Sequence, residues 1–168
     1  NELMLRQMMY TALQQESPSV LRYPRGVGEG TEWQGIPFEA VEVGRGECLR
    51  EGKDIAILAV GTMANVALRA AERSTKSVAV YDLRYVKPLD EALILDVARR
   101  FKHIITIEDG ILRGGVGESI AALIARNSLS PKITTLGIDD SFVEHGKPAE
   151  LYADCGYDEE ALLRVIEN

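Results

Sequence analysis

Short apolar runs alternate with helical patterns from residue 54 onward, and this alternation constrains the fold more than any other feature. Asp54–Val60 (DIAILAV) is almost continuously apolar, which is typical of a strand covered on both faces. A helical periodicity over 63–73 follows it. Further strands are expected at 78–83, 103–107 and 133–136. This order predicts an α/β fold with a mostly parallel, doubly wound sheet and helices on both faces.

The sequence also predicts two helix N-caps, an edge strand and the remaining helices. Asp90 and Asp158 each stand directly before a helical pattern, where an aspartate side chain can cap the first turn. The remaining expected elements are an edge strand within 42–50 and helices over 91–101, 118–126, 147–154 and 158–167.

Residues 1–41 follow a different pattern. Apolar side chains at helical spacing predict a helix over 2–14, and Val20–Tyr23 is predicted to be a short strand. Residues 24–37 are rich in glycine and are bounded by prolines, which is the composition of a linker. Because the chain opens within a helical pattern and lacks an initiator methionine, we expect a piece of a longer protein, with a loosely packed 1–41 and a separate domain over 42–168.

The composition argues against several function classes. A net charge of −7 is unfavourable for binding nucleic acid or a membrane surface. No apolar run approaches the roughly 18 residues of a membrane helix. The cysteines, Cys48 and Cys155, form neither a disulfide framework nor a metal motif. We expect a cytoplasmic protein.

Several polar motifs have both a functional and a structural interpretation. Gly114–Gly117 stands at a strand-to-helix turn, which favours anions, but Ile120 replaces the last glycine of a dinucleotide motif. Tight turning and close packing therefore explain these glycines better. Glu108 and Asp109 follow a predicted strand, where acids can be catalytic, although turn or interface roles are commoner.

The two histidines are interpreted as structural. His103 begins a predicted strand, and His145 lies in a polar loop where a hydrogen-bonded role is expected. With no cysteine pair near either of them, a zinc site has little support.

Arg25 is the strongest candidate for ligand binding. Pro24 fixes the backbone before it, and Gly26 permits a sharp turn after it. A guanidinium held in this way suits planar recognition of a phosphate or carboxylate, although a structural salt bridge is a commoner fate for such a residue.

The chain resembles the 1-deoxy-D-xylulose-5-phosphate synthase family of thiamine-diphosphate-dependent, transketolase-like enzymes along essentially its whole length. In chain order, the segments that carry the resemblance are Asn1–Thr11, Arg22–Gly26, Tyr81–Asp90, Thr106–Asp109 with Gly114–Gly117, and Leu136–Gly146. The family usually has E-E-N at Glu108–Gly110 and G-L-P-D at Gly137–Asp140, so this chain departs from the pattern in two loops.

The resemblance implies a fold and a reaction. Residues 1–41 would be the tail of a pyrimidine-binding domain plus a linker, and 42–168 the C-terminal domain of a homodimeric enzyme. The family condenses pyruvate with D-glyceraldehyde 3-phosphate with loss of CO2, and Arg25 matches an arginine that holds the phosphate. Thiamine diphosphate, Mg²⁺ and the catalytic glutamate belong to other domains, so this chain alone is expected to be inactive and to bind neither cofactor.

Three alternatives remain open. The C-terminal domain of a 2-oxo-acid dehydrogenase β subunit belongs to the same superfamily, and Arg22–Gly26 is the segment that distinguishes the two. A dimerisation domain without a small-molecule site is compatible with the sequence. A nucleotide-binding domain is weakened by the incomplete glycine pattern.

Overall fold

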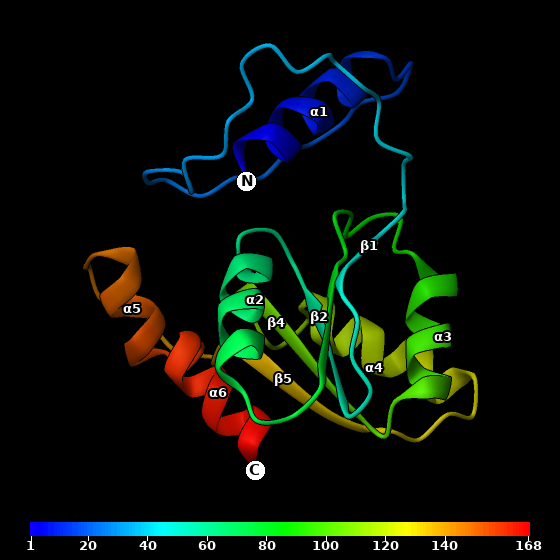
Figure 1. Cartoon of the computed structure of the whole chain (residues 1–168), viewed down its shortest axis with the longest axis vertical. Helices are drawn as coiled ribbons and strands as arrows, with labels where there is room; N and C mark the ends of the chain where they lie inside the picture. The colour runs from blue at the N-terminus through cyan, green and yellow to red at the C-terminus, as the bar shows by residue number, and fades with distance from the viewer. The chain divides into compact units, whose positions relative to one another are not determined.

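Five strands form a single sheet in the computed structural model, which describes residues 1–168 (Figure 1). The strand order is β1-β3-β2-β4-β5. β1 runs antiparallel to β3, and the other neighbouring strands are parallel. The strands are β1 Glu47–Arg50, β2 Ile55–Ala59, β3 Val78–Asp82, β4 His103–Ile111 and β5 Lys132–Ile138. The mostly parallel sheet and the edge strand are confirmed.

Helices cover both faces of this sheet. The helices of residues 44–168 are α2 Met63–Arg73, α3 Glu91–Arg100, α4 Val116–Arg126, α5 Pro148–Asp154 and α6 Glu159–Glu167. Ile57 and Ala59 lie in one core with α2 and α6, whereas Ala56 and Leu58 lie in a second core with α3 and α4. Since successive strand residues point to opposite faces and both faces are buried, β2 must be apolar throughout. The doubly wound fold is confirmed.

Both predicted aspartate caps form. Asp158 accepts a hydrogen bond from the Ala161 backbone N–H at 2.8 Å. Asp90 accepts from the Leu93 N–H at 3.0 Å and from the Gly46 N–H at 3.0 Å. One buried carboxylate therefore caps α3 and also holds the segment that enters β1.

The predicted element ends differ from the structure around β4 and α4. β4 continues to Ile111, because its pairing with β5 resumes there after an irregularity, with Ile111 opposite Ile138. α4 begins at Val116, which is earlier than the predicted 118.

The chain forms two compact units, residues 1–43 and residues 44–168. In the first unit, α1 (Glu2–Leu13) contacts the segment that follows it through hydrogen bonds and through the packing of Arg6 and Tyr10 against Phe38. Gln7 donates to the Pro37 carbonyl at 3.1 Å, and the Val41 N–H donates to Thr11 Oγ1 at 2.8 Å. None of the buried apolar residues belongs to this unit.

The predicted strand at Val20–Tyr23 is wrong, because this segment has no regular structure. Residues 1–43 contain no strand with which it pairs. An extended segment with no partner leaves its backbone groups to water, so β propensity alone does not make it a strand.

Candidate functional site

Arg25 lies in a bend with Gly26 directly after Pro24, and its side chain is exposed. It makes no hydrogen bond or ion pair within the chain, so its guanidinium is available to a ligand. The bend agrees with the sharp turn expected after Arg25. Gly26 does not adopt a left-handed φ, and a Cβ at that position would meet nothing within 4 Å.

The amides at the N-terminus of α4 are occupied by the chain's own carboxylates. Glu108, only 7% exposed, accepts hydrogen bonds from the Val116 N–H at 3.1 Å and from the Gly117 N–H at 2.8 Å. Glu118 accepts from the Gly114 N–H at 2.8 Å. These carboxylates satisfy the free N–H groups and the positive end of the helix dipole. An external phosphate would have to displace them.

The glycines of this turn serve close packing, which confirms the structural interpretation. A Cβ on Gly115 would lie 2.2 Å from the Ile111 carbonyl oxygen, and one on Gly117 would lie 2.6 Å from Thr106 Oγ1. Gly114 has open space around it but adopts a φ of +74°, in the left-handed region that favours glycine.

Asp109 anchors the α5–α6 segment to the end of β4. Its carboxylate accepts hydrogen bonds from the hydroxyl of Tyr157 at 3.0 Å and from that of Tyr152 at 3.4 Å. The two tyrosine rings contact each other, with centroids 5.0 Å apart. Burial, followed by the charge of Asp109, raises the pKa of Tyr157, so the phenol keeps its proton and remains a donor. These contacts give Asp109 a structural role.

The two histidines have different environments. His103 lies at the start of β4, and its Nε2 is 2.9 Å from Thr134 Oγ1. Burial, followed by the charges of Lys132 and Lys76, lowers the pKa of His103 and favours its neutral form, which confirms the structural interpretation. His145 is exposed and makes no hydrogen bond within the chain, so the expected hydrogen-bonded role is wrong.

The side chains of this chain do not fit a thiamine diphosphate–Mg²⁺ pair. No group of three or more His, Cys, Asp or Glu side chains converges in this chain. The only glycine turn that suggested a phosphate site from the sequence directs its amides at Glu108 and Glu118.

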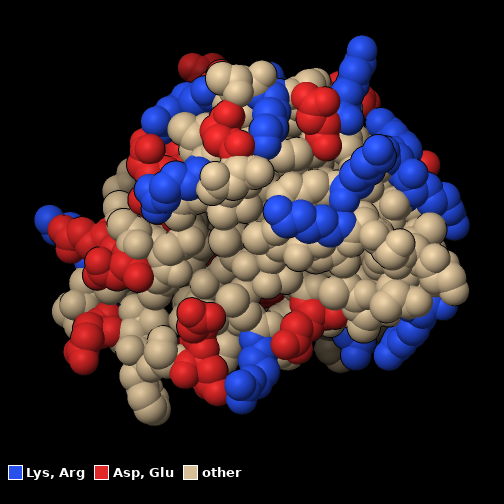
Figure 2. All heavy atoms as spheres, turned by 90° about the horizontal axis from the view of Figure 1, so that it is seen from below, with Lys and Arg blue, Asp and Glu red and all other residues tan.

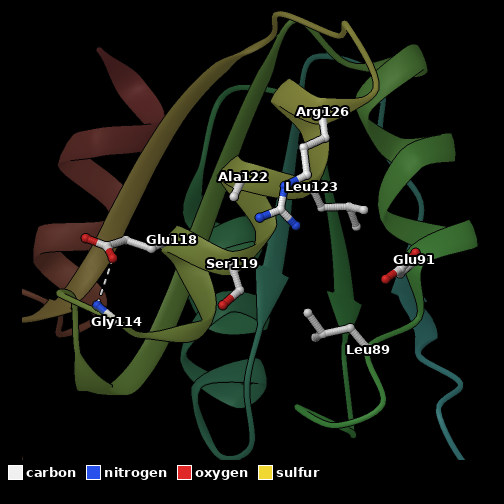
Figure 3. Close-up of a pocket in the computed structure, with 8 residues that line it drawn as sticks. All are labelled: Leu89, Glu91, Gly114, Glu118, Ser119, Ala122, Leu123 and Arg126. Atoms are coloured by element: carbon white, nitrogen blue, oxygen red, sulfur yellow. Dashed lines mark hydrogen bonds between the residues drawn. The ribbon is translucent and has the colours of Figure 1, made fainter.

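A shallow groove lies beside α4, next to the start of α3 (Figure 3). Its volume is about 400 Å³. Leu89 and Leu123 supply apolar surface, while Glu91, Glu118 and Arg126 supply charge. The remaining lining residues are Gly114, Ser119 and Ala122. The groove therefore combines an apolar surface with charges of both signs.

Sequence comparison finds relatives along nearly the whole chain. The 1-deoxy-D-xylulose-5-phosphate synthase of Phocaeicola vulgatus is 46% identical over 171 residues, covering 99% of this chain and 27% of the relative. The synthase of Bacteroides thetaiotaomicron is 47% identical, covering 99% of this chain and 26% of that protein. The chain thus spans about a quarter of the length of these curated relatives. The resemblance to the synthase family inferred from the motifs is confirmed.

Structure comparison and a family model agree on the domain. A solved structure of a split-gene transketolase, an inactive β4 tetramer, matches with a TM-score of 0.70 at 28% identity, covering 84% of this chain and 45% of that one. The model of the transketolase C-terminal domain matches residues 44–162, which include every strand of the sheet. The chain belongs to the family of transketolase C-terminal domains.

Proposed function

We propose that this chain is the C-terminal part of a 1-deoxy-D-xylulose-5-phosphate synthase. The longer enzyme is a transferase that condenses pyruvate with D-glyceraldehyde 3-phosphate and releases CO2, in the synthesis of isoprenoid, thiamine and pyridoxal precursors. The observation that carries this proposal is 46% identity over 99% of the chain to an enzyme of that name. Relatives of the same name recur among the other matches, which favours the synthase over a 2-oxo-acid dehydrogenase β subunit.

In this proposal the chain supplies a scaffold and one substrate contact, whereas the rest of the longer protein holds thiamine diphosphate and Mg²⁺. The cofactor supplies the carbanion chemistry. Residues 1–41 are assigned to the end of the pyrimidine-binding domain plus a linker, and 42–168 to the C-terminal domain. Support for this assignment comes from the two compact units of the chain, residues 1–43 and 44–168, and from the family model, which matches residues 44–162.

The chain alone is expected to bind no thiamine diphosphate. Titration of thiamine diphosphate with MgCl2 into the 168-residue chain should give no saturable heat in a calorimeter. The chain has no cluster of three or more candidate metal ligands, and the amides of its glycine turn are already bound to Glu108 and Glu118. The longer enzyme, titrated under the same conditions, is the positive control. A saturable signal from the chain alone would contradict this division of roles.

Arg25 is proposed to hold the phosphate of D-glyceraldehyde 3-phosphate. Support comes from its exposed side chain, from its position after Pro24 and from its lack of a partner within the chain. A guanidinium directs parallel N–H groups onto phosphate oxygens, which an ammonium cannot do.

We expect Arg25→Ala in the longer enzyme to raise the Michaelis constant for D-glyceraldehyde 3-phosphate and to leave that for pyruvate nearly unchanged. Pyruvate has no phosphate, and its carboxylate leaves as CO2. A charge-assisted hydrogen bond contributes about 1.5–3 kcal/mol, which corresponds to roughly 10–150-fold in affinity. The measurement is steady-state kinetics with both substrates varied.

Two further variants make this test specific. Arg25→Lys should recover only part of the loss, because it keeps the charge and loses the planar fork. Arg22→Ala, three residues earlier on the same segment, is the matched control and should leave both constants near the wild-type values. Equal weakening of both substrates by Arg25→Ala, or no change in either, would remove the phosphate role.

The proposed partners are a second copy of the protein and the two small substrates, in the cytoplasm. Nucleic acid is not a proposed partner, since the net charge is −7. The face seen in Figure 2 agrees with this, because acidic and basic side chains both surround an extended uncharged area. No helix combines the length and the apolar character that crossing a bilayer requires.

A further inference from the structure

The outer face of α4 carries small side chains. Ile120 and Ile124 point into the core, whereas Ser119 and Ala122 are exposed on the opposite side. Figure 3 shows Ser119, Ala122 and Arg126 projecting from the same side of the helix, next to the groove. Short side chains at the point of contact allow a second helix to approach closely.

Two side chains of opposite charge lie on this face of α4, at equal distances on either side of Ala122. Glu118 is four residues before Ala122, and Arg126 is four residues after it. Eight residues of helix span about 12 Å, so the two charges are well separated along the axis. If a second α4 lies antiparallel on the first, with a two-fold axis at Ala122, each Glu118 lies opposite the other copy's Arg126. A parallel arrangement would oppose like charges.

These charges are available for such a contact. Arg126 is exposed and has no ion pair within the chain. Glu118 uses Oε2 for the Gly114 N–H, which leaves Oε1 free to accept. In contrast, the α2–α6 layer pairs its charges internally, with Arg73 Nη1 2.7 Å from Glu159 Oε1 and 2.6 Å from Glu160 Oε1.

The groove adds apolar surface to the charged contact. Leu89 and Leu123 line it beside α4, and Glu91 adds a carboxylate from the start of α3. A helix seated on Ala122 would cover these leucines, while its arginine would reach Glu118 at the rim. An apolar centre with charged groups at its edge is the usual arrangement of a protein interface.

We propose that the outer face of α4 is an interface with a second copy of this chain, with Ala122 at the two-fold axis and reciprocal Glu118–Arg126 ion pairs. This inference rests on the proposed homodimer and assigns one contact of that dimer to α4. The surface is self-complementary, as a two-fold contact requires. Its occupant is therefore an identical helix.

Reversal of either charge should break this contact, and a mixture of the two variants should restore it. Sedimentation velocity of the 168-residue chain at micromolar concentration should show a dimer for the wild type. Glu118→Arg and Arg126→Glu should each weaken self-association by about tenfold or more, because each places like charges opposite one another twice. An equimolar mixture should form a heterodimer, since opposite charges then meet at both positions.

The control is Glu72→Arg, which makes the same charge change at an exposed position of α2, in the layer on the other side of the sheet. It should leave the dimer unchanged. A wild-type chain that remains monomeric overturns the α4 interface. A dimer that neither reversal weakens overturns it as well, but leaves the proposed homodimer in place on another surface.

A disulfide test locates the axis independently of charge. In a Cys48→Ser background, which removes the exposed native thiol, Ala122→Cys should form an intermolecular disulfide under mild oxidation in both this chain and the longer enzyme. Glu72→Cys in the same background is the matched control and should form far less. Absence of the Ala122→Cys cross-link in the longer enzyme, while its kinetics with both substrates remain normal, would overturn the interface without affecting the proposed reaction.

Discussion

Replacement of Glu108 by alanine is expected to lower the free energy of unfolding by about 3 kcal/mol. The change removes the acceptor of two N–H groups, that of Gly117, which is buried, and that of Val116, which is half-buried. A buried donor left unsatisfied costs about 1–3 kcal/mol, and loss of a carboxylate at a helix N-terminus adds about 0.3–1 kcal/mol. β4 and the start of α4 should lose stability together, because Glu108 connects them.

Urea denaturation followed by circular dichroism measures this effect as a lower midpoint at an unchanged slope. Glu108→Gln should fall between alanine and wild type, because the amide keeps one acceptor oxygen and places an NH2 group where the second was. Glu118→Ala is the matched control, since it removes an exposed carboxylate that caps the same turn through Gly114. If Glu108→Ala is no more destabilising than Glu118→Ala, then Glu108 is not the main cap of α4.

Gly115→Ala is expected to destabilise the domain by about 3 kcal/mol, at the upper end of overpacking effects. The added Cβ would lie 2.2 Å from the Ile111 carbonyl oxygen and 2.7 Å from Glu108 Oε1. The first of these atoms belongs to the backbone at the end of β4, which is tied to β5. Neither that backbone nor the cap can move without loss of hydrogen bonds, so the helix start has to shift.

A substitution at Gly114 distinguishes the cost of a steric clash from the cost of an unfavourable backbone conformation. Gly114→Ala meets no atom within 4 Å but has to adopt a φ of +74°. An alanine in the left-handed region costs roughly 1–2 kcal/mol, so Gly114→Ala should be the milder change. Thermal or urea unfolding of both variants under one condition gives the comparison. Equal effects would show that the close approach of α4 to β4 is not what selects Gly115.

The sequence predicts well those features that depend on residues close together in the chain. The β2 run is apolar throughout because both of its faces are covered, and that pattern is readable without the fold. Asp90 and Asp158 are predictable as caps because the N–H group that each accepts lies only three residues ahead in the sequence. The synthase resemblance also depended on local motifs, among them the segment that contains Arg25, whose phosphate role remains a prediction.

Other features were decided by contacts between residues distant in the sequence. Val20–Tyr23 has strand-forming side chains, yet a strand needs a partner, and residues 1–43 provide none. Glu108 accepts a hydrogen bond from the N–H of Gly117, nine residues ahead. Capping motifs that can be recognised in a sequence span about three residues, so they do not predict this bond. Asp109 finds Tyr157 forty-eight residues later.

The sequence by itself thus determined the class of fold, the helix caps and the family, because backbone periodicity and short motifs are local properties. The tertiary structure alone decided that the α4 turn is closed by Glu108 rather than open to an anion. It also decided that Glu118, Ala122 and Arg126 lie beside an apolar groove. Such properties depend on which side chains the sheet brings together. A buried carboxylate such as Glu108 needs hydrogen-bond partners, and the fold supplies them from residues that are not its neighbours in the chain.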